Sequence, residues 1–179
     1  ETIMAHNSVQ AVSLTGSERA GSAVASIAGK HIKKSLLELG GNNAFIVWDD
    51  ADVDAAVKTA LVARMLNCGQ SCIAAKRFIL MDGIYDEFVS KFTEAVKALK
   101  SGDPMDDNTQ VGPLARLDLA NQLHRQVNES IAKGAKLLLG GKQDNCYQTF
   151  RRKIRIWSRL HNYDQGNQTT DLQPILHRT

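Results

Sequence analysis

The feature that most constrains the fold of this chain is an uninterrupted apolar run at residues 44–48, AFIVW. A run without polar alternation is typical of a strand buried on both faces of a mainly parallel sheet. Asp49 and Asp50 close the run, and from about Asp52 onward the apolar residues keep helical spacing. A buried strand followed directly by an amphipathic helix predicts an α/β architecture.

The rest of the sequence repeats this alternation of strand and helix. Turn-forming glycines and helix-capping residues such as Ser17 separate the segments. We predict strands at residues 9–14, 34–39, 77–81 and 135–139, and helices at residues 17–30, from about 52, 85–99 and 117–133. Strands that alternate with helices in this way favour parallel pairing.

Length and composition exclude several classes of protein. A chain of 179 residues with 43% hydrophobic residues can bury a core and fold as one domain or two small ones. No run approaches the ~18 apolar residues of a membrane span. The start of the chain has no signal-peptide pattern and its first residue is not Met, which fits an excised or truncated piece. Three cysteines disfavour a disulfide framework, so we expect a cytoplasmic protein.

The net charge of +3 is concentrated at one end of the sequence. Residues 150–179 contain six Lys or Arg against two Asp, which leaves the body of the chain near neutrality. The basic triplet Arg151, Arg152 and Lys153 could contact nucleic acid, although basic runs are usually solvated tails. We therefore expect no nucleic-acid partner and no membrane partner.

Two short segments carry the residues best suited to chemistry. Residues 36–41, LLELGG, offer the Glu38 carboxylate beside a Gly-Gly turn, and residues 67–72, NCGQSC, offer the Cys72 thiol. A thiol and a base can together perform covalent catalysis on a carbonyl carbon. Residues 73–75 could begin a short helix whose dipole would stabilise a Cys72 thiolate. A partly desolvated Glu38 would suit the work of a general base.

Other interpretations of these residues remain open on the sequence. Cys72 could be an ordinary buried thiol, and Glu38 a solvated residue at a strand end. A cysteine hydrolase would need a histidine partner, and none stands out among the five scattered histidines. Cys68 and Cys72 lack the further ligands that zinc requires, so we expect no metal site and take Cys68 as a packed residue.

Residues 14–21, LTGSERAG, read as a strand end, a glycine turn and a helix start. Backbone N–H groups and the helix dipole can hold a pyrophosphate at such a turn. The segment is neither a Rossmann G-x-G-x-x-G fingerprint nor a P-loop.

Together, these three segments resemble the aldehyde dehydrogenase superfamily, with the strongest similarity at residues 11–21, 35–54 and 67–77. Its bacterial succinate-semialdehyde branch is the one most similar to the combination of SLTGSERAG at residues 13–21, CIAAKRFI at residues 72–79 and GPLAR at residues 112–116. The resemblance implies that Cys72 is the nucleophile, that Glu38 is the general base, and that NAD or NADP is the cofactor. It implies a homo-oligomeric parent enzyme. It also implies that Ser17 is the phosphate ligand and that Gly21 lets the helix approach closely, within a set of cofactor contacts made of Gly16, Ser17, Gly21, Leu39 and Gly40.

The resemblance also implies a domain arrangement. Residues 1–40 would be the end of a doubly wound dinucleotide-binding domain, and residues 41–149 part of an α/β catalytic domain. Residues 150–179 depart from the family, and we expect a shifted reading frame or a foreign tail there. The implied reaction is oxidation of an aldehyde, succinate semialdehyde by the branch, to its acid. The alternative is an inactive truncated fragment that at most binds a dinucleotide.

Overall fold

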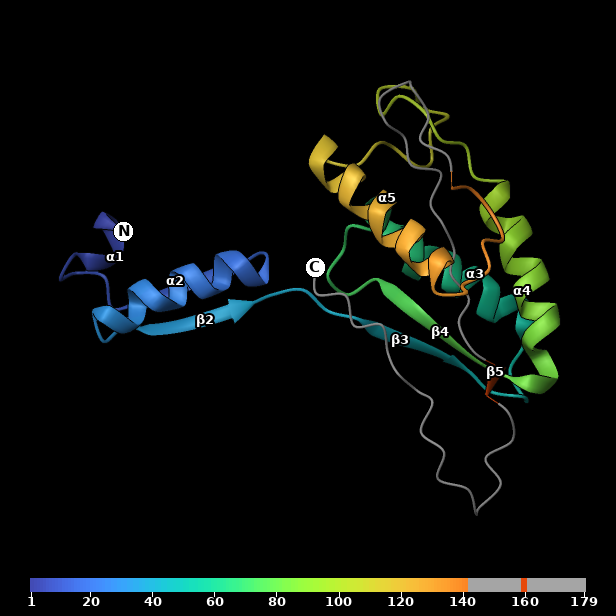
Figure 1. Ribbon diagram of the computed structural model, residues 1–179, viewed down its shortest axis with the longest axis horizontal. Coiled ribbons are helices and arrows are strands. Elements are labelled where there is room, and N and C mark those ends of the chain that lie inside the picture. The colour runs from blue at the N-terminus through green and yellow to red at the C-terminus, as the bar shows by residue number, and fades with distance from the viewer. Residues whose placement is uncertain (142–158, 161–179) are drawn as a thin grey trace, which may run out of the picture. The chain divides into compact units, whose positions relative to one another are not determined.

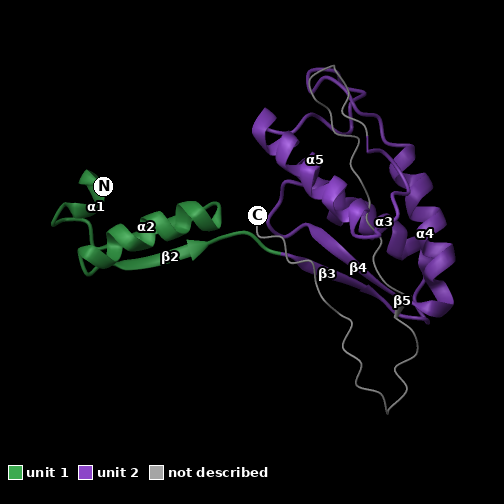
Figure 2. Ribbon diagram, in the orientation of Figure 1, with its two compact units in different colours: residues 1–41, 174–179 green, residues 42–173 purple. Residues whose placement is uncertain are grey.

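The computed structural model describes residues 1–141 and 159–160. These residues divide into two compact units, and the chain passes from one to the other between Gly41 and Asn42 (Figure 2). Both units are built on parallel strands with helices packed against them (Figure 1). The predicted α/β architecture is therefore confirmed.

The first unit is a strand–helix–strand crossover preceded by a short helix. Its elements are α1 (Thr2–Ala5), β1 (Ala11–Thr15), α2 (Glu18–Lys30) and β2 (Lys34–Glu38). The two strands pair in parallel, with Ala11 opposite Lys34 and Thr15 opposite Glu38. Ser17 caps α2 as predicted, because its side-chain oxygen accepts a hydrogen bond from the Ala20 N–H at 3.2 Å.

Helix α2 approaches the end of β2 at a glycine. A Cβ atom added at Gly21 would lie 2.7 Å from Leu39 Cδ2 and 2.9 Å from Leu39 Cδ1. Real Cβ atoms essentially never come so close to another carbon. Gly21 is buried, whereas Gly29 on the same helix is exposed and has nothing within 4 Å of its Cβ position. The sequence-based expectation that Gly21 permits close helix packing is therefore confirmed.

The second unit contains a parallel sheet of strand order β3-β4-β5. Its strands are β3 (Asn43–Val47), β4 (Ala75–Met81) and β5 (Arg159–Leu160), and its helices are α3 (Val53–Met65), the 3₁₀ helix η1 (Leu66–Gly69), α4 (Asp82–Lys97) and α5 (Leu117–Ala132). Asp52 caps α3 by accepting a hydrogen bond from the Ala55 N–H at 3.0 Å. Helices α3 and α4 pack against each other and against β4 (Figure 1).

Three phenylalanine rings form the centre of this unit. The ring of Phe78 on β4 lies 4.9 Å from that of Phe92 and 6.2 Å from that of Phe88, measured between centroids. Phe88 and Phe92 lie one turn apart on α4, and both are fully buried. Val47 and Leu80 complete the contact from the sheet. Burial of such large apolar side chains is the dominant stabilising term for a small domain.

The apolar run at residues 44–48 is a strand, but it is not buried on both faces. Val47 lies in the core, whereas the side chains of Ile46 and Trp48 are 63% and 60% exposed. Helices α3 and α4 pack on the face of the sheet that carries Val47, Phe78 and Leu80. The prediction of burial on both faces was therefore wrong for this chain, because the described helices cover one face.

Two further predictions of secondary structure also differ. Residues 135–139 form no strand, because no described strand pairs with them, although Leu139 packs against the core. In the basic tail, where no strand was expected, Arg159 and Leu160 pair with the edge of β4. The edge of a parallel strand offers backbone groups that such a segment can bond. Cys146 and all residues of the 150–179 tail other than Arg159 and Leu160 lie outside the described residues.

Phe92→Ala should destabilise the second unit by about 3–5 kcal/mol, because it leaves a cavity among three packed rings. Urea denaturation followed by circular dichroism measures the change. Val62→Ala on the exposed face of α3 is the matched control and should change the free energy of unfolding by less than about 0.5 kcal/mol. Equal effects of the two substitutions would contradict the packing described.

Gly21→Ala and Gly29→Ala should have opposite effects on thermal stability. Alanine at position 29 should stabilise α2 by about 0.5–1 kcal/mol, because the site is open and alanine favours helix. Alanine at position 21 should destabilise the unit, because its Cβ would collide with Leu39. The double variant Gly21→Ala/Leu39→Ala removes the collision. Stabilisation by Gly21→Ala alone would contradict the close approach of α2.

Candidate active site

Most of the predicted site residues converge at the carboxyl end of the β1–β2 pair. The Gly16 N–H donates to the Glu38 carbonyl oxygen at 2.9 Å, so the glycine turn and the candidate base are joined. Ser17 starts α2 at this end, and Gly21 packs on Leu39. Gly40 follows directly. In α/β sheets the carboxyl ends of the strands are the usual place for ligands.

This arrangement can hold the diphosphate of a dinucleotide. The first turn of a helix carries backbone N–H groups without partners inside the helix and the positive end of its dipole. Helix α2 presents that turn beside the Gly16 backbone, and Gly21 leaves no side chain between the helix and Leu39. The residues of the first unit could therefore hold the diphosphate of a dinucleotide, with Ser17 at the start of the helix.

Glu38 is the last residue of β2, and its side chain is exposed. The expected partial desolvation of this carboxylate is not found within the described residues. All positions of β2 except Leu37 are exposed, because one helix covers this two-stranded sheet.

Cys72 lies in the loop between η1 and β4, and its side chain is exposed. The helix expected at residues 73–75 does not form. The Ala74 N–H donates to the Ser71 carbonyl at 3.2 Å to close a turn, and Ala75 already pairs with Asn43 in the sheet. Sheet pairing therefore takes the residues that the helix would need, and no helix dipole acts on the thiol from this side.

The backbone just before Cys72 has an uncommon conformation. Asn67, Cys68 and Gly69 have φ angles of 50°, 53° and 67°, so three consecutive residues are left-handed. Non-glycine residues in this region cost of order 1–3 kcal/mol each and persist only where the surroundings hold them. The loop therefore needs restraint from neighbouring segments.

Two long-range hydrogen bonds supply that restraint. The Gly112 N–H donates to Cys68 Sγ at 3.2 Å, and the Ala115 N–H donates to Gln70 Oε1 at 3.0 Å. Cys68 is half-buried, in agreement with its interpretation as a packed residue near the nucleophile. Within residues 1–141 and 159–160, no group of three or more His, Cys, Asp or Glu side chains could hold a metal ion.

Two cations that the sequence analysis did not single out bond the same loop. Arg64 Nη1 donates to the Gly69 carbonyl at 3.3 Å, and Lys76 Nζ donates to the Cys72 carbonyl at 3.1 Å. Burial lowers the pKa of Arg64. Burial and, secondarily, the charge of Arg64 lower the pKa of Lys76, while Cys72 acts in the opposite direction. The spacing of Lys76, four residues after the cysteine, was the available signal in the sequence.

The structure does not bring the two predicted catalytic residues into one unit. Glu38 belongs to the first unit and Cys72 to the second. Within the second unit, Arg77 Nε donates to the Asn42 carbonyl at 3.0 Å. This bond ties the segment that enters from Gly41 to the strand that follows Cys72.

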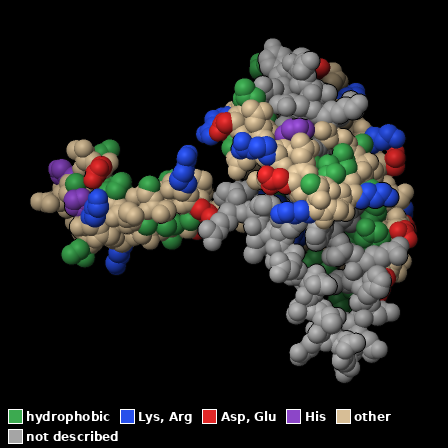
Figure 3. All heavy atoms as spheres, in the orientation of Figure 1, with side chains coloured by type: hydrophobic (Ala, Val, Ile, Leu, Met, Phe, Trp, Pro, Cys, Tyr) green, Lys and Arg blue, Asp and Glu red, His purple; other side chains and the backbone are tan. Residues whose placement is uncertain are grey.

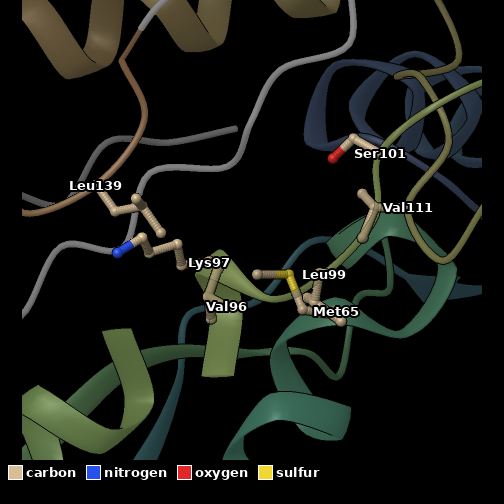
Figure 4. Close-up of a pocket in the computed structure, with 7 residues that line it drawn as sticks. All are labelled: Met65, Val96, Lys97, Leu99, Ser101, Val111 and Leu139. Atoms are coloured by element: carbon tan, nitrogen blue, oxygen red, sulfur yellow. The ribbon is translucent and has the colours of Figure 1, made fainter. Parts of the chain in front are cut away.

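A hollow elsewhere on the described surface is lined by none of the predicted site residues. An apolar hollow of about 40 Å³ is lined by Met65, Val96, Lys97, Leu99, Ser101, Val111 and Leu139, none of them a predicted site residue (Figure 4). On the face seen in Figure 3, basic and acidic side chains of the second unit are interspersed. Among the described residues, every helix is too short or too polar to span a bilayer.

Comparison with known proteins identifies the family to which this sequence is similar. The aldehyde dehydrogenase family matches residues 1–151. A succinate-semialdehyde dehydrogenase [NADP(+)] of Mycobacterium avium is 56% identical over 142 residues, which are 79% of this chain and 30% of that protein. A succinate semialdehyde dehydrogenase [NAD(P)+] of Escherichia coli is 51% identical over 135 residues, 75% of this chain and 29% of that protein.

A solved structure supports the same family. The succinic semialdehyde dehydrogenase of Streptococcus pyogenes in complex with NADP+ aligns with a TM-score of 0.79 at 41% identity, over 83% of this chain and 33% of that one. The chain thus spans about three tenths of the length of the curated relatives it matches. Since the family matches most of the sequence and carries the same fold, this chain belongs to the aldehyde dehydrogenase family.

Proposed function

We propose that this chain carries the nucleophile and the general base of an NAD(P)-dependent aldehyde oxidation, with succinate semialdehyde as the substrate. The observation that carries the proposal is an exposed thiol, Cys72, in a strained loop that four hydrogen bonds to side chains restrain. The names of the Mycobacterium avium and Escherichia coli relatives support the substrate and the cofactor. We expect a cytoplasmic enzyme and, from the family, a homo-oligomer.

The chemistry begins at Cys72. Its thiolate forms a bond to the aldehyde carbon, and the carbonyl oxygen takes the negative charge of the thiohemiacetal. Bound NAD(P)+ supplies the hydride acceptor for the two-electron oxidation of this adduct to a thioester. The loop around Cys72 keeps the sulfur in one position during the attack on the aldehyde and during the oxidation of the adduct.

Glu38 completes the reaction as a general base. Its carboxylate takes a proton from a water molecule that attacks the thioester carbon, and the Cys72 thiolate leaves as the carboxylic acid forms. The Gly16 N–H bonds the backbone carbonyl of Glu38, so the residue that carries the base lies next to the turn that would hold the cofactor diphosphate. The reaction consumes one water and one NAD(P)+ and restores both side chains.

A second candidate, a fragment that binds a dinucleotide without turnover, has one observation in its favour. All of the predicted cofactor contacts lie within the first unit, whereas the predicted nucleophile lies in the second. Cofactor binding by a folded chain that does not oxidise aldehydes would favour this candidate.

Cys72→Ala should abolish aldehyde-dependent reduction of NAD or NADP. Glu38→Gln should lower the steady-state rate by about 10²–10⁴-fold, the usual contribution of a general base. Absorbance of the reduced cofactor measures both, with succinate semialdehyde beside an aliphatic aldehyde. Glu94→Gln is the matched control and should keep most of the activity. Unchanged turnover in Cys72→Ala would contradict the proposed nucleophile.

Ser17→Asp should abolish dinucleotide binding while leaving α2 stable. Aspartate caps a helix about as well as serine, but its charge would repel a diphosphate at the helix start. Titration calorimetry with NAD and NADP measures binding, and thermal unfolding measures stability. Ser26→Asp adds the same charge farther along the exposed side of α2 and should bind normally. Equal binding by both variants would exclude the diphosphate from this turn.

A further inference from the structure

The carbonyl of Cys72 accepts a hydrogen bond from the side chain of a lysine that follows it in sequence. Lys76 is the second residue of β4, and its side chain folds back so that Nζ lies 3.1 Å from that carbonyl oxygen. The carbonyl that accepts this bond belongs to the same residue as the thiol, and Lys76 and Cys72 interact electrostatically. The Lys76 ammonium adds a positive charge to the immediate surroundings of the nucleophile.

Arg64 is a second cation that bonds the same loop. Arg64, near the end of α3, is half-buried and bonds the Gly69 carbonyl three residues before Cys72. The charges of Arg64 and Lys76 repel each other, which contributes to the lowered pKa of Lys76, whereas Cys72 and Lys76 attract. Arg77, the next residue, is engaged with the Asn42 carbonyl. Among the described residues, the side chains of α3 and β4 that bond this loop, Arg64 and Lys76, are therefore both cations.

We propose that Lys76 is a positioning and specificity-determining residue: its ammonium holds the Cys72 loop and favours the approach of anionic electrophiles to the thiol. The proposal rests on Cys72 as the nucleophile, and it names the substrate class as aldehydes that carry a carboxylate. An attractive charge near the point of attack raises the local concentration of an anion and the rate at which it arrives. Arg64 supports the effect by restraining the backbone on the other side of the loop.

The test compares two alkylating reagents on the intact chain. Iodoacetate is an anion and iodoacetamide is neutral, but both transfer a two-carbon group to the same thiolate, which attacks their methylene carbon and displaces iodide. Changes in accessibility, loop order or thiolate fraction act on both reagents, so they cancel in the ratio of the two rates. Peptide mass spectrometry reports the rates at Cys72 alone. The ratio therefore isolates the charge of Lys76 from a purely structural role.

Lys76→Gln should lower the iodoacetate-to-iodoacetamide ratio at Cys72 by about two- to fivefold, as expected for one charge near a protein surface. Lys76→Arg should keep the ratio. Lys91→Gln is the matched control, because Lys91 bonds Asp54 and Glu87 on α3 and α4. High salt should reduce the wild-type ratio towards that of Lys76→Gln.

An unchanged ratio in Lys76→Gln would overturn the proposal, and so would an equal fall in Lys91→Gln. Neither result depends on aldehyde turnover. If the ratio falls as expected but the chain does not oxidise aldehydes, the electrostatic role of Lys76 stands and the proposed function fails. If aldehydes are oxidised with an unchanged ratio, the function stands and the role of Lys76 fails.

Discussion

The parallel pairing of β3 with β4 is the constraint on which the candidate site depends. The pairing starts at Asn43 and Ala75, only three residues after Cys72, so the register of β4 fixes where the loop ends. The pairing itself depends on the phenylalanine cluster, since Phe78 on β4 packs against Phe92 of α4. A substitution in this core would therefore change the loop that carries Cys72 as well as the stability of the unit.

The loop before Cys72 is held in a backbone conformation that non-glycine residues rarely adopt. Three consecutive left-handed residues precede Cys72. The restraining hydrogen bonds reach the loop from α3, from β4 and from residues 112–115. Such strain is typical of functional sites, where a fixed geometry is worth its cost in stability. The exposed Cys72 thiol thus combines access for a substrate with a rigid backbone.

Much of the fold could be predicted from the sequence, because it follows from local patterns. Apolar periodicity gave the order of strands and helices, and the Ser17 cap and the close approach at Gly21 followed from residue type. The conformation around Cys72 could not be predicted in this way. The helix expected after it is replaced by sheet pairing, and the bond from Gly112 to Cys68 joins residues 44 positions apart. The exposure of Ile46 likewise depends on which helices cover the sheet.

The central claim is that Cys72 attacks the aldehyde carbon, and trapping the thioester tests it most directly. The Glu38→Gln chain would be incubated with succinate semialdehyde and NADP, then digested and analysed by mass spectrometry. The account predicts one succinyl group on the peptide that carries Cys72, because acylation proceeds and release is stalled. A folded, cofactor-bound chain that carries the acyl group on Cys68, or on no cysteine, would contradict it.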